Sequence, residues 1–209
     1  VEMVAEGNDK LLEEFFDTGT LPVEHIVDGL REAMRQRRMF PVLCASALRN
    51  TGSDLILNFA IEYFPNPAER GPWKATFHGA DTDREVKDSQ PLSAFIFKTS
   101  ADPFAGRVSY FKVVSGVLKN DAHLIDVRKG AEERLAHIGT LAGKAINPIP
   151  ELHAGDIGGV AKLRDALTGD TLTDKASQIA YPPVQVPEPS IAYAVSAKSG
   201  NLKGAVGLA

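Results

Sequence analysis

The sequence predicts an α+β fold in several domains: a helical head with one strand–helix unit of the α/β kind, followed by a complete antiparallel β-barrel. Three observations lead to this prediction. Apolar residues recur with helical spacing over residues 9–63, apart from one short continuous apolar run. From Pro91 the spacing changes to two, which is typical of half-buried strands. Turn residues then separate short segments as far as residue 181, with no long helical pattern between them.

Two helices are predicted in the head. The first covers residues 9–17 and is expected to stop at Gly19. The second has Pro22 in its first turn, where a missing N–H does no harm. Its apolar stripe runs from Val23 to Met34, and its C-terminal end is rich in arginine, which suits the helix dipole. We interpret that arginine run as a solvated helix end, and a phosphate-binding patch is the alternative.

A strand–loop–helix unit is predicted next. The almost continuous apolar run from Met39 to Ala45 is typical of a strand buried on both faces of a parallel sheet, so Cys44 is expected to be an inert core thiol. Ser53 can cap a helix whose apolar side faces a core until Pro65 ends it. One such unit cannot bury both faces of its strand. The chain is therefore expected to be a piece of a longer protein.

Beyond the head, residues 68–88 are polar and of mixed charge, and they predict a linker. The barrel is expected over residues 89–181. Its predicted strands are residues 92–97, 108–114, 122–128, 134–141, 156–163 and 171–173. Prolines at 182–189 indicate a domain boundary, and Ile191–Ala197 is expected to form one more strand.

Composition excludes several classes of protein. The formal net charge is −4, with net −5 over residues 1–67 and net +1 over residues 89–181, so bulk charge does not indicate a nucleic-acid binder and DNA is not expected as a partner. No apolar run approaches the ~20 residues of a membrane span, so no membrane partner is expected. The single cysteine excludes an internal disulfide framework and favours a cytoplasmic location.

Several motifs carry a family resemblance, in order along the chain. They are residues 41–52, Pro91 to Thr99, Asp102 to Arg107, Ser115 to Lys119, Ala154 to Ile157, Thr168 to Leu172 and Pro187 to Pro189. Together they resemble the elongation factor G family of translational GTPases, including its paralogues. Asn120-Asp121 departs from the Gly-Asp common in that family after the barrel lysine, although it keeps the turn.

The resemblance implies a domain layout. Residues 1–38 would be the helical part of a G-domain insertion, 39–67 the last strand and helix of the G domain, 68–88 a linker, 89–181 the second-domain barrel and 182–209 the start of a third domain. It also implies that the intact parent binds GTP and Mg²⁺ and works on the ribosome in translocation or recycling. Its partners would be small-subunit rRNA and, within the molecule, the G domain.

The resemblance also implies a guanine-binding loop at Ser46, Ala47 and Leu48, because small residues let the base approach the main chain. The chain has no phosphate loop, no Asp-x-x-Gly switch element ahead of the barrel and no Asn-Lys-x-Asp motif. We therefore expect this piece to hold no cofactor and to be inactive alone, and the sequence leaves open whether the parent is a GTPase.

Residues 102–107 allow two interpretations. They form either a tight turn between strands, or a loop tip on which Phe104 and Arg107 meet a phosphate, a base or a neighbouring domain. Further candidates for partner contact are Lys112, Lys119 and Arg128. Two other functions remain possible: a non-catalytic β-barrel module that binds RNA or protein, and a ribosomal-protection factor of the same architecture.

Overall fold

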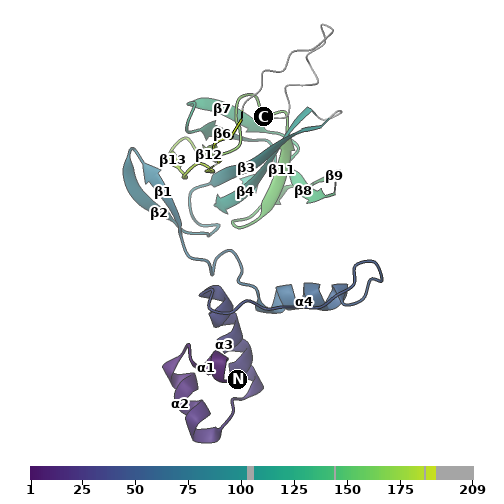
Figure 1. Ribbon diagram of the computed structural model, residues 1–209. Coiled ribbons are helices and arrows are strands. Elements are labelled where there is room, and N and C mark those ends of the chain that lie inside the picture. Colours follow the sequence, from purple (N-terminus) through teal and green to yellow (C-terminus); the bar gives the residue numbers. More distant parts are fainter. Residues whose placement is uncertain (103–105, 144, 186, 192–209) are drawn as a thin grey trace. The chain divides into compact units, whose positions relative to one another are not determined.

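The computed structural model describes residues 1–102, 106–143, 145–185 and 187–191 (Figure 1). The chain divides into two compact units, Val1–Arg70 and a second unit that begins at Gly71. The first unit is helical and the second consists of strands. None of the described helices is long and apolar enough to cross a membrane. The fold class is the predicted one, α+β with an antiparallel barrel.

The first unit begins with three helices: α1 (Glu2–Ala5), α2 (Asp9–Thr18) and α3 (Val23–Arg35). The side chain of Asn8 accepts a hydrogen bond from the Lys10 amide at 3.0 Å and caps the start of α2. Gly19 ends that helix with φ 74°, and its amide donates to the Phe15 carbonyl. Both helices predicted in the head are therefore confirmed. Their small core contains Val4, Ala5, Leu21, Gly29 and Ala33.

The predicted strand at residues 39–45 is wrong. These residues have no regular secondary structure, Val42 is 90% exposed and Cys44 is exposed rather than buried. A strand buried on both faces needs hydrogen-bonded neighbours and covering layers. Residues 1–70 provide neither, because the sole bridge in that unit is the isolated pair Ser46 and Thr51.

The helix predicted after this segment is present as α4 (Ser53–Tyr63), with Gly52 in the N-cap position at φ 77°. The core expected on its apolar side is not found. Of its residues none is buried, and Ile61 is 82% exposed. Phe59 stacks on Tyr63 with ring centroids 4.5 Å apart, so the aromatic residues of this helix contact one another instead.

The second unit is built on an eight-stranded antiparallel sheet that curls around one core (Figure 1). Its strand order is β7-β6-β12-β3-β4-β11-β8-β9. The bounds are β3 (Ser93–Asp102), β4 (Gly106–Ser115), β6 (Ala122–Asp126), β7 (Ala131–Leu135), β8 (Gly139–Ala142), β9 (Ala145–Pro148), β11 (Ile157–Ala161) and β12 (Thr171–Thr173). Two short strands, β5 (Leu118–Lys119) and β10 (Glu151–Leu152), pair with each other.

The core of the sheet consists of aliphatic side chains around Phe111, which is fully buried. Gly158 on β11 permits this packing, because a Cβ at that position would lie 2.4 Å from Leu152 and 2.9 Å from Phe111. Register shifts in the β3–β4 pair, between Ile96 and Lys98, interrupt the strict alternation of faces.

The sheet is open between its end strands. In the described residues β7 and β9 do not pair, so the curled sheet that forms the predicted barrel has a seam between these two strands. Exposed Glu132 and Arg134 on β7, and Pro148 on β9, disfavour further strand pairing at these edges. The predicted strand 134–141 is also divided, because β7 ends at Leu135 and His137 takes φ 59° before β8.

The linker predicted at residues 68–88 is also wrong, because most of it is a hairpin. Strands β1 (Trp73–Phe77) and β2 (Ala80–Arg84) pair across a turn at His78 and Gly79, and β13 (Ile179–Ala180) pairs with β1. The hairpin packs on the outside of the large sheet through an aromatic cluster. Its members are Trp73, Ala75, Phe95, Val114, Ile179 and Tyr181. The strand predicted at Ile191–Ala197 falls almost wholly outside the described residues.

Candidate functional site

Two turns with the same sequence ending, Gly-Asp, share one geometry. In the turn His153–Asp156 the amide of Asp156 donates to the His153 carbonyl at 3.0 Å, and the Asp156 Oδ2 accepts from the His153 amide at 2.8 Å. In the turn Leu167–Asp170 the corresponding distances are 3.1 and 2.7 Å. The glycines have φ 101° and 90°, which a type II turn requires at its third position. Each turn leads directly into a strand, β11 or β12.

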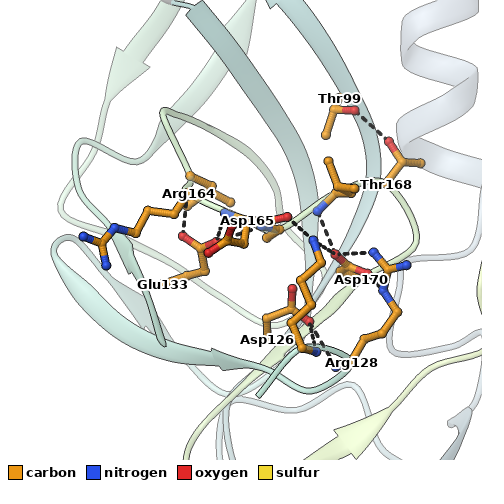
Figure 2. A network of polar contacts seen from close by, with 12 residues as sticks. Thr99, Asp126, Arg128, Glu133, Arg164, Asp165, Thr168 and Asp170 are labelled. Atoms are coloured by element: carbon orange, nitrogen blue, oxygen red, sulfur yellow. Dashed lines mark hydrogen bonds and ion pairs between the residues drawn. The ribbon is translucent and has the colours of Figure 1, made fainter. Parts of the chain in front are cut away.

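Asp170 is the centre of a polar network (Figure 2). Its side chain is buried, its Oδ1 lies 2.5 Å from Arg128 Nε, and its Oδ2 accepts from Arg128 Nη2 at 3.0 Å. Lys129 Nζ lies 3.7 Å from the same Oδ2. Burial alone would raise the pKa of Asp170, but the hydrogen bonds from Arg128 and Leu167 and the two cations lower it on balance. Asp170 is therefore ionised.

Asp126 is the second buried carboxyl of the network, and its surroundings disfavour the ionised form. Burial raises the pKa of Asp126, and the negative charge of Asp170 raises it further. Its Oδ1 accepts from the amides of Arg128 and Lys129 at 3.0 and 3.3 Å, whereas its Oδ2 has no hydrogen-bond partner among the described residues. The two neighbouring carboxyls therefore have pKa values shifted in opposite directions: that of Asp126 is raised and that of Asp170 is lowered.

Glu133 connects β7 to the segment before the second Gly-Asp turn. Its buried carboxylate accepts three backbone N–H groups: Arg164 at 2.8 Å, Asp165 at 2.6 Å and Ala166 at 2.8 Å (Figure 2). Its neighbour Glu132 is exposed and lies 2.5 Å from His123 Nδ1. The alternation along β7 therefore directs two adjacent glutamates to opposite faces.

Arg107 holds the same segment from the other side. Its Nη2 donates to the carbonyls of Leu163 and Arg164 at 2.7 and 2.6 Å, and the Lys162 amide donates to the Arg107 carbonyl at 2.8 Å. Arg107 and Arg128 were both candidates for partner contact. In the structure the guanidinium of each is bonded within the barrel, so both organise residues 162–170.

The other predicted contact residues lie apart from this network. Lys112 Nζ lies 5.9 Å from the centre of the Trp73 ring. Lys119 is exposed on β5 opposite Glu151 of β10. Phe104 lies outside the described residues. Sequence reasoning brought Lys112, Lys119 and Arg128 together as one surface, and the structure assigns them different local partners.

Ser46, Ala47 and Leu48 form part of a tight turn in the first unit. Ser46 and Thr51 exchange backbone hydrogen bonds of 2.9 and 3.0 Å, and the Asn50 amide donates to the Ala47 carbonyl at 3.2 Å. Leu48 is 99% exposed. Among the described residues, no protein acceptor is found for the amides of Ala47 and Leu48.

Sequence reasoning missed Asp126, Glu133 and Asp170 as network residues. One signal was available, because Asp170 belongs to the Thr168 to Leu172 motif. An aspartate in a turn can accept a hydrogen bond from a backbone amide of the same turn, as Asp170 does from Leu167. The burial of Glu133 had no comparable signal, because its partners are backbone amides some 30 residues away.

Comparison with known proteins gives two results. Residues 91–175 match the family described as elongation factor G domain 2. Among solved structures, the chain is similar to a protein from Thermus thermophilus, with 27% sequence identity and a TM-score of 0.71 over 91% of this chain. That match covers 26% of the Thermus chain, so the present chain spans about a quarter of its length. The covered share extends into both units.

Proposed function

We propose that this chain, whose residues 91–175 match elongation factor G domain 2, belongs to the elongation factor G family and acts in protein synthesis as part of a ribosome-associated translational GTPase. The two Gly-Asp turns carry this proposal, because they are the family-typical motifs at Ala154 to Ile157 and Thr168 to Leu172, and both have one shared geometry. The whole protein would work in translocation or ribosome recycling.

In this proposal the whole protein binds GTP with Mg²⁺, which supplies Lewis-acid stabilisation of the phosphates. The turn at Ser46, Ala47 and Leu48 would border the guanine base. Two features support this role: the turn is exposed, and the amides of Ala47 and Leu48 have no acceptor among the described residues. The phosphate loop and the Asn-Lys-x-Asp motif are absent from the 209 residues, so other residues must bind the phosphates.

The barrel would contact small-subunit rRNA. Arg107, Lys112, Lys119 and Arg128 remain the candidates for that surface among the described residues, and the Arg128 side chain is 59% exposed although it binds Asp170. The near-neutral charge of residues 89–181 predicts a weak contact made by few phosphates. In the cell these partners would place the protein in the cytoplasm.

Nucleotide titration tests the GTP part of the proposal. The whole protein should bind a fluorescent GTP analogue, and Ala47→Asp should weaken binding by about 10-fold or more, or ~1.4 kcal/mol, because it places a charged side chain against the base edge. The exposed neighbour Arg49 provides the control, and Arg49→Gln should leave affinity unchanged. Equal affinity of Ala47→Asp and wild type would refute the role of this turn.

Co-sedimentation with small ribosomal subunits tests the ribosomal part. The slope of log affinity against log salt should fall by about 1 for each lysine that contacts a phosphate, so Lys112→Gln/Lys119→Gln should lower it by about 2. Lys10→Gln, an exposed lysine of the helical unit, is the matched control. An unchanged slope in the double variant would exclude these two lysines from the contact.

A further inference from the structure

A groove of about 880 Å³ lies at the seam of the curled sheet. Its lining comes from β6, β7 and the two residues after it, β9, and the end of β11 with the residues that follow, so it occupies the region where the end strands β7 and β9 do not pair. Ala136, Ile146, Pro148 and Ala161 form apolar parts of its wall. Its volume falls in the range of about 300–1,000 Å³ that is typical of small-molecule sites.

An added β-strand is a poor occupant of this groove. Glu132 and Arg134 on the edge of β7 are charged, and Pro148 on β9 has no N–H to donate. Such residues are the usual means by which sheet edges avoid pairing with another chain. A compact ligand that needs side-chain contacts, rather than a peptide that needs an open edge, fits the groove better.

The ionised groups around the groove fall into two sets. Glu132 pairs with His123, Asp121 binds Arg134 through two contacts of 2.5 and 2.9 Å, and the Glu133 carboxylate accepts three backbone amides. Within the described residues, in contrast, neither Lys162 Nζ nor the Arg164 guanidinium has an ion-pair or hydrogen-bond partner. Figure 2 shows the Arg164 side chain extending away from the network around Asp170. The carboxylates are thus engaged, and two cations are available.

The backbone that carries these two cations is fixed in place. Glu133 accepts the Arg164 amide, Arg107 donates to the Leu163 and Arg164 carbonyls, and the ammonium group of Lys129 contacts the Asp165 carbonyl. Lys162 itself has φ 63°, an uncommon conformation for a residue with a side chain. Backbone strain of this kind persists only where surrounding contacts enforce it, and it gathers at binding sites.

We propose that this groove binds a small organic anion: an apolar, ring-sized body that bears one phosphate or carboxylate group. The anionic group lies between Lys162 and Arg164, where the guanidinium can donate two parallel hydrogen bonds to its oxygens. The apolar body lies against Ile146, Pro148 and Ala161. This site is independent of the proposed ribosomal role, since it uses neither the turn at 46–48 nor Lys112 and Lys119.

The test is an NMR titration of the ¹⁵N-labelled chain with phenyl phosphate and, separately, with benzoate. We expect saturable shifts of the amides of His137, Gly139 and Ala161, with a dissociation constant of about 1 mM or lower for at least one of the two. Which of them binds more tightly distinguishes a phosphate from a carboxylate ligand. Inorganic phosphate should bind at least about 10-fold more weakly, because it lacks the apolar body, and benzylamine should cause no shift.

Lys162→Gln/Arg164→Gln should weaken binding by about 10-fold or more, whereas Lys175→Gln, at an exposed lysine outside the groove, should leave it unchanged. Far-UV circular dichroism establishes that the double variant is folded, and Arg164→Lys provides a milder change that keeps the charge. The proposal is overturned if neither anion shifts the resonances of these amides at ligand concentrations up to about 10 mM. It is also overturned if benzylamine or inorganic phosphate binds equally well, or if the double variant binds like wild type.

Discussion

Asp126 and Asp170 are neighbouring buried carboxyls with opposite pKa shifts. Asp170 has Arg128 and Lys129 beside it, and these cations outweigh the effect of burial on its pKa. Asp126 accepts hydrogen bonds from two backbone amides, but burial and the charge of Asp170 outweigh these and raise its pKa. A carboxyl whose pKa is raised by folding stabilises the protein fully below its unfolded pKa of 3.8, and that contribution is lost as the pH rises through the folded pKa.

We therefore expect Asp126→Asn to stabilise the barrel at neutral pH. The amide keeps an oxygen for the Arg128 and Lys129 amides and removes the opposed charge, and its NH₂ group can face Asp170. The gain should be about 1–2 kcal/mol at about pH 7 and should shrink toward about pH 4. Urea unfolding at both values measures it.

Asp170→Asn is the matched control for this pair. The pKa of Asp170 is lowered, so its contribution to stability is present above the unfolded pKa of 3.8 and is lost as the pH falls. This variant should destabilise the barrel at neutral pH by about 2–3 kcal/mol, because Arg128 loses its ionised partner. Destabilisation by Asp126→Asn at neutral pH would contradict the account of the pair.

Tyr181 gives a second pH-dependent prediction. Burial raises the pKa of Tyr181 from 10.0 to about 12, and its hydroxyl lies 2.7 Å from Ser93 Oγ. Its contribution is complete below pH 10 and is lost as the pH rises through about 12. Tyr181→Phe should cost about 1 kcal/mol at neutral pH and reduce the loss of stability at about pH 11. Urea unfolding at the two pH values is the measurement, and an equal alkaline loss in the variant would show that another group titrates.

At the scale of elements, Glu133 attaches β7 to residues 164–166. The carboxylate of Glu133 accepts hydrogen bonds from three backbone amides. In Glu133→Gln the NH₂ group would face at least one of these amides, so that two donors oppose each other. We expect a loss of about 2–3 kcal/mol, since a buried donor without a partner costs about 1–3 kcal/mol. The adjacent Glu132→Gln should change stability by less than about 0.5 kcal/mol, because that side chain is exposed. Equal effects of the two variants in thermal unfolding would exclude the capping role.

The success of the sequence prediction differed between elements for physical reasons. Strands β3 and β4 were predictable from local periodicity, because every second residue of part of each strand packs in the inner core. These residues are Ala94 and Ile96 on β3, and Phe111 and Val113 on β4. The run Met39–Ala45 is equally apolar, but no neighbouring strand within residues 1–70 pairs with it. The β1–β2 hairpin was missed because Asp81, Asp83 and Lys74 point to solvent, and Trp73 packs on Tyr181 more than 100 residues later.

The candidate site was less predictable than the fold. Sequence reasoning selected Arg107 and Arg128 for their charge, whereas the structure uses both to bind groups of residues 162–170. Lys162 and Arg164 looked like ordinary surface residues, and their significance comes from the unpaired end strands beside them. Whether a cation is available depends on which acceptors the fold brings to it, and that depends on long-range contacts.

At the scale of the whole molecule, the two units differ in how much they bury. The first unit buries Val4, Ala5, Leu21 and Ala33 as its apolar residues, whereas the second has a continuous core around Phe111. We expect the helical unit to unfold at a lower urea concentration. Far-UV circular dichroism follows the helices, and the single tryptophan, Trp73, reports on the second unit by fluorescence. Coincident transitions by the two probes would show that the units unfold together.

The pairing of β1 with β13 brings the first strand of the barrel unit beside the last strand of its described part, with Thr76 opposite Ala180 and Phe77 opposite Ile179. Such a unit can be spliced into a host protein without spreading the host apart, since the incoming and outgoing chain leave from adjacent strands. Mechanical tension applied through the flanking sequences would reach these two residue pairs first. The large sheet would be loaded later, so the β1–β13 pair would separate before the strands of that sheet.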